Sequence, residues 1–260
     1  MLQPPRLINL SLPKTGSTSL AGAFPPGLST HEGFHEHTVV SILNYLERKS
    51  TQADLLHFLR RRQKLLGTPA DIATFLHWIP VELLELWPNA KFLHVFRHPC
   101  QWACSYLGML HNISSSLTKR TSLCNISWFE RYGRCQSSLL SVANLNQTFS
   151  SARETRDLIE DLINFWYERH QTVCLAIPEE KLWHSKLQGL ADNLPSLARW
   201  IGSDLPIAEQ LPRLNQNPSD VRLQRWLLEQ ACQASQRASV RKAIDHYGQF
   251  PACRSPTAVG

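Results

Sequence analysis

The chain has 260 residues, of which 43% are hydrophobic, and this is enough for one sizeable core. Twenty-seven basic residues against 21 acidic ones give a formal net charge of +6. Such an excess suits an anionic ligand but is too small to indicate a nucleic-acid-binding protein. We therefore expect a single domain over residues 1–260, or one domain with an elaborate insertion.

The N-terminal region holds the most informative pattern of the chain. Residues 7–12 form an apolar run that predicts a short buried strand, which Pro13 ends. A hydroxyl-rich turn follows and leads into a segment that can begin a helix; its residues are Lys14, Thr15, Gly16, Ser17, Thr18 and Ser19. Backbone N–H groups at a helix start, a lysine charge and a glycine that permits close approach together predict a phosphate cradle. The alternative is a junction that is merely rich in hydroxyls.

A short segment after this turn matches a zinc-binding pattern letter by letter. Residues 31–35 read His-Glu-Gly-Phe-His, which in metalloproteases lies on one helix. Here the preceding residues 24–30 predict a turn, and Gly33 weakens any helix at its centre. We therefore expect no zinc site, and we expect most histidines of this segment to lie on the surface.

The next stretch is predicted to be helical, apart from one turn. Residues 38–49 and 52–66 have amphipathic periodicity, and Thr51 is placed to cap the second helix. Arg60–Arg62 is the only dense basic run; a solvated helix face is the favoured interpretation, and contact with an acidic substrate the alternative. Residues 67–69 form a turn, and residues 75–87 are helical again with a break near Pro80.

A second strand and helix follow. Residues 88–98 predict a turn and a buried strand, with Arg97 at its C-terminal end. Pro99 suits the first turn of a helix, which places Ser105 about two turns further on. Taken alone, Arg97 could equally be a strand-end residue that faces solvent.

The remaining elements complete an α/β pattern. Residues 111–151 are rich in Ser and Asn and predict a polar excursion, either a substrate-contacting loop or an insertion without a role. Residues 154–175, 194–201 and 221–247 predict helices, and 181–187 predict a strand. This alternation favours an α/β fold with a mainly parallel central sheet and helices on both faces. Both anion-binding segments then lie at the carboxyl ends of strands, where open α/β sheets bind ligands.

The sequence P-K-T-G-S-T-S from Pro13, with the spacing R-x-P-x-x-x-x-x-S from Arg97 to Ser105, resembles the P-loop sulfotransferases that use 3′-phosphoadenosine 5′-phosphosulfate (PAPS). The similarity is closer to tyrosylprotein-type and carbohydrate-type enzymes than to nucleotide triphosphatases, whose Walker loop places Lys after its second Gly. It covers residues 7–110 well and the rest loosely. The resemblance implies that Lys14 and residues 15–19 bind the 5′-phosphosulfate, that Arg97 and Ser105 bind the 3′-phosphate, and that no metal is needed.

The resemblance also implies a catalytic carboxylate in the loop after the first helix. Glu32 lies eighteen residues after Lys14 and is the expected general base, with Glu36 and His31 as alternatives. We expect burial beside the donor to raise the pKa of Glu32, offset by the Lys14 charge. Asp71 resembles an acidic position near the acceptor pocket, or is a helix N-cap. Residues 188–190 read Gln-Gly-Leu where the family usually has an acidic residue, so we assign no role there.

The expected function is transfer of a sulfuryl group from PAPS to a hydroxyl acceptor by in-line attack, with 3′,5′-adenosine bisphosphate as product. The acceptor stays open among carbohydrate, peptide tyrosine, lipid and small alcohol, and nucleic acid is not expected. Two alternatives from other classes remain: a P-loop kinase with a degenerate Walker loop, and a nucleotide-binding module without turnover.

The sequence has no N-terminal apolar segment long enough for a signal peptide and no stretch of 18 apolar residues. Its seven cysteines are scattered without a C-x-x-C pair, which indicates reduced thiols and a reducing compartment. We therefore expect no transmembrane segment and a cytoplasmic protein. The family also contains anchored Golgi enzymes, and a sequence trimmed of its anchor would look similar.

Overall fold

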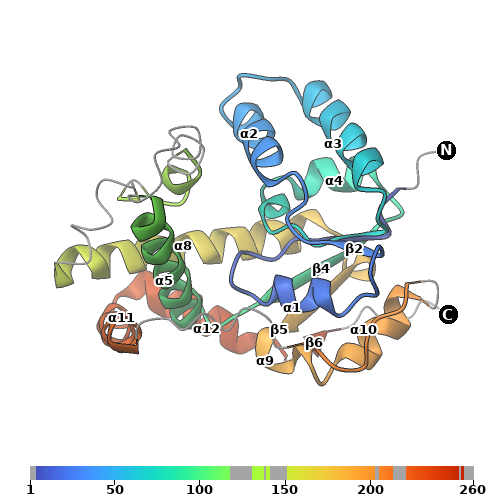
Figure 1. Ribbon diagram of the computed structural model, residues 1–260. Helices are drawn as coiled ribbons and strands as arrows, with labels where there is room; N and C mark the ends of the chain where they lie inside the picture. The colour runs from blue at the N-terminus through green and yellow to red at the C-terminus, as the bar shows by residue number, and fades with distance from the viewer. Residues whose placement is uncertain are drawn as a thin grey trace. The chain divides into compact units, whose positions relative to one another are not determined.

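The computed structural model in Figure 1 describes residues 4–117, 131–137, 139–140, 151–202, 205–212, 221–251 and 253–254, with the backbone alone for 113–117 and 253–254. The chain folds into two compact units. The first comprises Met1–Arg97, Arg169–Gln216 and Pro251–Gly260, and the second comprises His98–Glu168 and Asn217–Phe250. That these units form one domain over residues 1–260 stays a prediction.

The first unit is built on one six-stranded sheet with the strand order β2-β3-β1-β4-β5-β6. Neighbouring strands from β2 to β5 are parallel, and β6 pairs antiparallel with β5. The strands are β1 (Leu7–Asn9), β2 (Ser29–Thr30), β3 (Ala70–Asp71), β4 (Lys91–Phe96), β5 (Leu182–Lys186) and β6 (Cys253–Arg254). The predicted α/β fold with a mainly parallel sheet is therefore confirmed.

Helices lie on both faces of this sheet (Figure 1). Helices α1 (Ser17–Gly22), α9 (Leu187–Leu190) and α10 (Leu194–Ile201) lie on one face, and α2 (His35–Leu46), α3 (Gln52–Leu66) and α4 (Pro80–Leu86) on the other. On the first face, Leu20, Leu190 and Leu197 pack in one core with Leu93 and Trp183 of the sheet. Each such fully buried side chain stabilises the fold by about 1.5–3 kcal/mol. Shorter 3₁₀ segments are η1 (Phe75–Trp78) and η2 (Glu179–Lys181).

Helix α3 confirms one prediction and corrects another. Thr51 is its N-cap and forms a reciprocal capping box with Asp54, as the sequence indicates. Arg60 and Arg61 are exposed, but only 2% of Arg62 is. The expected solvated face is wrong for Arg62, because it falls on the buried stripe of this helix, one turn after Leu59.

The second unit is helical. Helix α5 (Pro99–Leu117) packs against α11 (Val221–Ala234) and α12 (Ala238–Gln249), and residues 152–168 of α8 (Ala152–Ala176) belong to this unit. In its core, the Trp102 ring stacks on Tyr106 with centroids 5.2 Å apart. The predicted helix over residues 221–247 is wrong in one respect: it is two helices, because Arg237 has an extended backbone and donates hydrogen bonds to the carboxylates of Asp157 and Glu160.

Part of the predicted excursion over residues 111–151 is helical, since α5 continues through Leu117. Residues 118–130, 138 and 141–150 lie outside the described part of the chain, so the rest of that prediction is not tested. Among the described helices, none is long and apolar enough to cross a membrane. Cysteines with reduced thiols are Cys100, Cys104, Cys135, Cys174 and Cys232.

Candidate functional site

Basic residues gather where neighbouring parallel strands of the first unit end. Lys14 follows β1, and Arg97 directly follows β4, which pairs with β1 in parallel. Burial lowers the pKa of Lys14, and the charge of Arg97 lowers it further, so the two cations lie close enough to repel each other. A bound anion would relieve that repulsion.

Lys186 adds a third basic side chain at this edge of the sheet. It ends β5 and pairs with Phe96, the residue before Arg97. We did not single out Lys186 from the sequence. Its place at the carboxyl end of a predicted strand was the signal that could have found it.

The turn after β1 has the backbone of a close-approach site. Lys14 has φ 66°, and Gly16, the N-cap of α1, has φ 88°. The positive φ of Gly16 favours glycine there, and a Cβ atom would lie 2.7 Å from Leu187 Cδ1, so the Leu187 side chain would have to shift. The Thr15 hydroxyl donates to the Leu12 carbonyl at 2.6 Å. The side chain of Thr15 therefore holds the turn together, and its backbone N–H remains the group that can reach an anion.

The segment from His31 to His35 is brought to the first turn of α1. Nε2 of His31 lies 3.2 Å from Ser17 Oγ and 3.3 Å from Thr18 Oγ1. The same nitrogen is 3.8 Å from Glu32 Oε1. Two predicted parts of the site, the hydroxyl-rich turn and the His31–His35 segment, therefore lie side by side.

Glu32 is held by hydrogen bonds to both carboxylate oxygens. Oε1 accepts from the Thr74 backbone N–H at 3.1 Å and from the Thr74 hydroxyl at 2.6 Å, and Oε2 lies 3.2 Å from His35 Nδ1. Burial raises the pKa of Glu32, but the hydrogen bonds from His35 and Thr74, with the nearby imidazoles, outweigh it and leave the pKa below its ordinary value. The expected raised pKa of Glu32 is therefore wrong. Thr74 was not singled out in the sequence analysis.

For His31, in contrast to Glu32, burial is the dominant effect on the pKa. Burial lowers its pKa, and the nearby Glu32 carboxylate only partly offsets this. Its side chain is 31% exposed, so the imidazole is neutral but accessible near pH 7. The neighbouring Glu36 and His37 are exposed, as expected of surface residues.

The zinc-like pattern does not lie on one helix. Glu32 and Phe34 have positive φ angles of 54° and 53°, and α2 begins only at His35. The predicted turn is confirmed over residues 24–28, where it leads into β2 at Ser29–Thr30, and the two histidines do not share a helix face. Among the residues described in the structure, no three His, Cys, Asp or Glu side chains are grouped to hold a metal ion.

Asp71 lies in β3 and is 1% exposed. It is not a helix N-cap, as the sequence had allowed, because Thr74 takes that position before η1. Nη1 and Nη2 of Arg62 donate to its two carboxylate oxygens, the second at 3.1 Å. Asp71 therefore forms a buried ion pair, and its place near an acceptor pocket stays a prediction.

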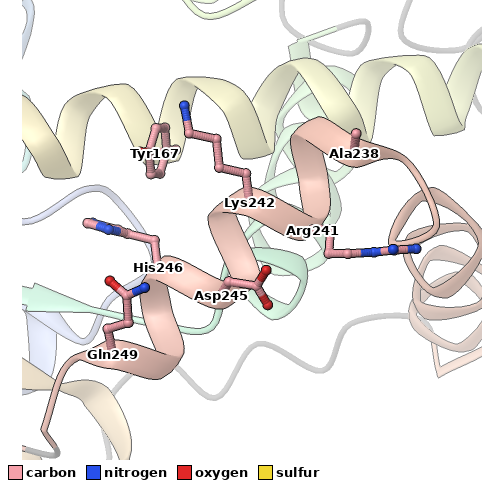
Figure 2. Close-up of a pocket in the computed structure, with 7 residues that line it drawn as sticks. All are labelled: Tyr167, Ala238, Arg241, Lys242, Asp245, His246 and Gln249. Carbon is pink, nitrogen blue, oxygen red and sulfur yellow. The ribbon is translucent and has the colours of Figure 1, made fainter.

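The second unit contains Ser105, which is half-buried in α5. The same unit has a pocket of about 420 Å³ between α8 and α12, in which Lys242 lies beside the Tyr167 ring (Figure 2). Its lining residues are Tyr167, Ala238, Arg241, Lys242, Asp245, His246 and Gln249. None of the residues predicted from the sequence as site residues lines this pocket.

The sequence profile of the sulfotransferase domain matches residues 6–219 of the chain. This is most of its length, and the protein therefore belongs to the sulfotransferase family. The matched range includes Lys14, Glu32, Arg97 and Ser105. No curated protein matches the chain.

Proposed function

We propose that the protein transfers a sulfuryl group from PAPS to a hydroxyl group of an acceptor. The observation that supports this best is the pair of cations at adjacent strand ends, Lys14 and Arg97, in a chain of the sulfotransferase family. Their mutual repulsion and the glycine turn at Gly16 fit a ligand with phosphate groups at both ends. The donor supplies the activated sulfuryl group and a phosphate leaving group.

Lys14 and the backbone N–H groups of residues 15–18 would bind the 5′-phosphosulfate and stabilise the negative charge that grows on its bridging oxygen. Arg97, with Ser105 and its hydroxyl, would hold the 3′-phosphate through charge-assisted hydrogen bonds. Such a reaction needs little covalent catalysis by the protein, so positioning and charge stabilisation would supply most of the rate enhancement.

Glu32 is our proposed general base, which removes the proton of the acceptor hydroxyl. Its carboxylate is ionised near pH 7, and the three hydrogen bonds leave it a lone pair to accept a proton. His31 is the second candidate, because its Nε2 contacts the hydroxyls of Ser17 and Thr18. In either case the base acts beside the turn that would hold the donor.

Isothermal titration with 3′,5′-adenosine bisphosphate and with ATP plus Mg²⁺ tests the ligand. We expect binding of the bisphosphate, and preference for ATP would favour the kinase. A transfer assay with ³⁵S-labelled PAPS and a panel of sugars, tyrosine peptides, lipids and alcohols tests turnover. Binding without transfer to any acceptor would favour the nucleotide-binding module.

A further inference from the structure

We infer that Arg62 is a positioning residue, which fixes the turn carrying His31 and Glu32 beside the first turn of α1. This inference rests on the proposed function of that turn. Arg62 comes from α3, on the opposite face of the sheet from α1 (Figure 1). It belongs to a basic run whose other two members are exposed.

Arg62 joins two segments with one guanidinium group. Besides its ion pair with Asp71, it donates from Nε and Nη2 to the Gly33 carbonyl, at 3.2 and 3.0 Å. The Arg62 and Asp71 side chains are each 1% exposed, so water does not weaken these bonds. The carbonyl of the residue after Glu32 is therefore tied to strand β3.

Gly33, whose carbonyl Arg62 binds, lies at the centre of a backbone segment with unusual φ angles. Gly33 stands between Glu32 and Phe34, which both have positive φ angles. Such conformations are strained and persist only where the surroundings hold them. Gly33 is also closely packed, since a Cβ atom there would lie 2.5 Å from Leu66 Cδ2 and from Thr30 Cγ2. The Arg62 bonds supply the polar part of this restraint.

The Arg62–Asp71 ion pair also lies next to the segment that holds the Glu32 carboxylate. Asp71 lies three residues before Thr74, whose N–H and hydroxyl bind the Glu32 carboxylate. Arg62 therefore sets both the backbone that carries Glu32 and the segment that holds its carboxylate. A lysine would keep the charge, but a single ammonium group cannot reproduce the planar fork that bonds Asp71 and Gly33 together.

The test compares Arg62→Lys with Arg61→Lys, a matched control one residue away on the exposed face of α3. We expect Arg62→Lys to lower kcat by about 10–100-fold, as a displaced catalytic group does, while the Kd for 3′,5′-adenosine bisphosphate stays within about twofold. The control should keep both values. Guanidinium chloride at low millimolar concentration should restore part of the kcat of Arg62→Ala.

A second measurement does not depend on turnover. In the wild-type protein, the NMR titration of His31 should give a pKa below its ordinary value, and in Arg62→Lys this pKa should return toward it. If the wild-type protein transfers no sulfuryl group, the proposed function fails, and the His31 titration still decides the role of Arg62. Wild-type kcat and an unchanged His31 titration in folded Arg62→Lys would overturn the inference.

If Arg62→Lys does not fold, Asp71→Asn takes its place, since it preserves side-chain volume and the bonds from Arg62 to Gly33. We expect a smaller loss of kcat, with donor affinity unchanged. A lower melting temperature with wild-type kcat and an unchanged His31 titration would make the pair merely structural and would overturn the inference.

Discussion

Two clusters that contain histidines in the first unit differ in how far solvent reaches their side chains. The loop cluster, His31, Glu32 and His35, has a carboxylate, and its side chains are 21–38% exposed. The core cluster, His94, His170 and His184, packs ring against ring at the sheet, and at most 8% of each residue is exposed. Imidazole near a carboxylate and solvent can exchange protons, whereas burial disfavours the charged form of an imidazole and keeps it neutral.

The hydrogen bonds of the core cluster fix its protons. His94 Nδ1 lies 3.1 Å from the Leu10 carbonyl, which can only accept, so Nδ1 carries the hydrogen. His94 Nε2 then accepts from His170 Nδ1 at 2.8 Å. Burial, with the neighbouring His184, lowers the pKa of His94 to about 3. We therefore expect substitutions at the loop cluster and its anion site to change rate or donor binding, and those in the core cluster to change stability.

The largest effect is expected for Lys14→Ala, which should abolish measurable transfer. Lys14 is half-buried after a strand and is repelled by the charge of Arg97, so the fold should survive its loss. Steady-state kinetics with PAPS measure the effect, and Lys64→Ala, on the exposed side of α3, is the control. A loss of kcat/KM below tenfold, or under about 1.4 kcal/mol, would remove Lys14 from the role of anion anchor.

Glu32→Gln should lower kcat by about 10²–10⁴, the usual range for a positioned general base, and leave donor affinity nearly unchanged. Because the pKa of Glu32 lies below its ordinary value of 4.5, the acidic limb of kcat/KM should lie below pH 4.5 and vanish in the variant. If Glu32→Gln keeps full activity and His31→Ala or Glu36→Gln loses it, the role of general base belongs to that neighbouring residue. Loss of activity on adding a zinc chelator would revive the metal interpretation of residues 31–35.

Much of the fold followed from local patterns. Alternating apolar runs and amphipathic segments predicted β1, β4 and β5 and the helices α3, α8 and α10, because periodicity and capping are encoded within a few residues. Helices α11 and α12 were predicted as one. The break depends on Arg237, whose carboxylate partners on α8 are about 80 residues earlier in the chain.

The parts of the site that lie next to predicted strands could be predicted from the sequence. Lys14, Gly16 and Arg97 sit next to strands that the sequence marks, so topology alone brings them to one edge. Arg62 and Thr74 were missed because each acts through a partner distant in sequence: Arg62 on Gly33 and Thr74 on Glu32. The sign of the pKa shift of Glu32 was wrong for the same reason, since burial was foreseen and its hydrogen bonds were not.

Arg97→Ala should weaken donor binding by about 2–4 kcal/mol, since charge-assisted hydrogen bonds to phosphate are lost, and Ser105→Ala should do so more mildly. Titration of each variant with adenosine phosphates that have or lack the 3′-phosphate measures the effect. Both variants should lose discrimination between these ligands. Discrimination equal to that of the wild type would remove the assignment of the 3′-phosphate to this pair.

The smallest effect belongs to the core cluster and concerns stability. The pKa of His94 is about 3 in the folded protein, against 6.5 for an ordinary histidine. Between these pH values the unfolded chain therefore binds a proton at His94 that the folded chain does not bind. The stability from neutral His94 is complete above pH 6.5 and is lost as pH falls toward 3. Its slope approaches about 1.4 kcal/mol per pH unit between these values.

Urea unfolding of the wild type and of His94→Asn between pH 4 and 8 measures this slope. Asn keeps a donor for the Leu10 carbonyl but does not titrate, so the variant should be less stable by about 1–3 kcal/mol at pH 8, where His170 loses its acceptor. Its stability should then fall less steeply toward pH 4 by up to about 1.4 kcal/mol per unit. The kcat of folded His94→Asn should match that of the wild type. An equal slope in both proteins would show that His94 is protonated in the fold, and a large loss of kcat would erase the distinction between the two clusters.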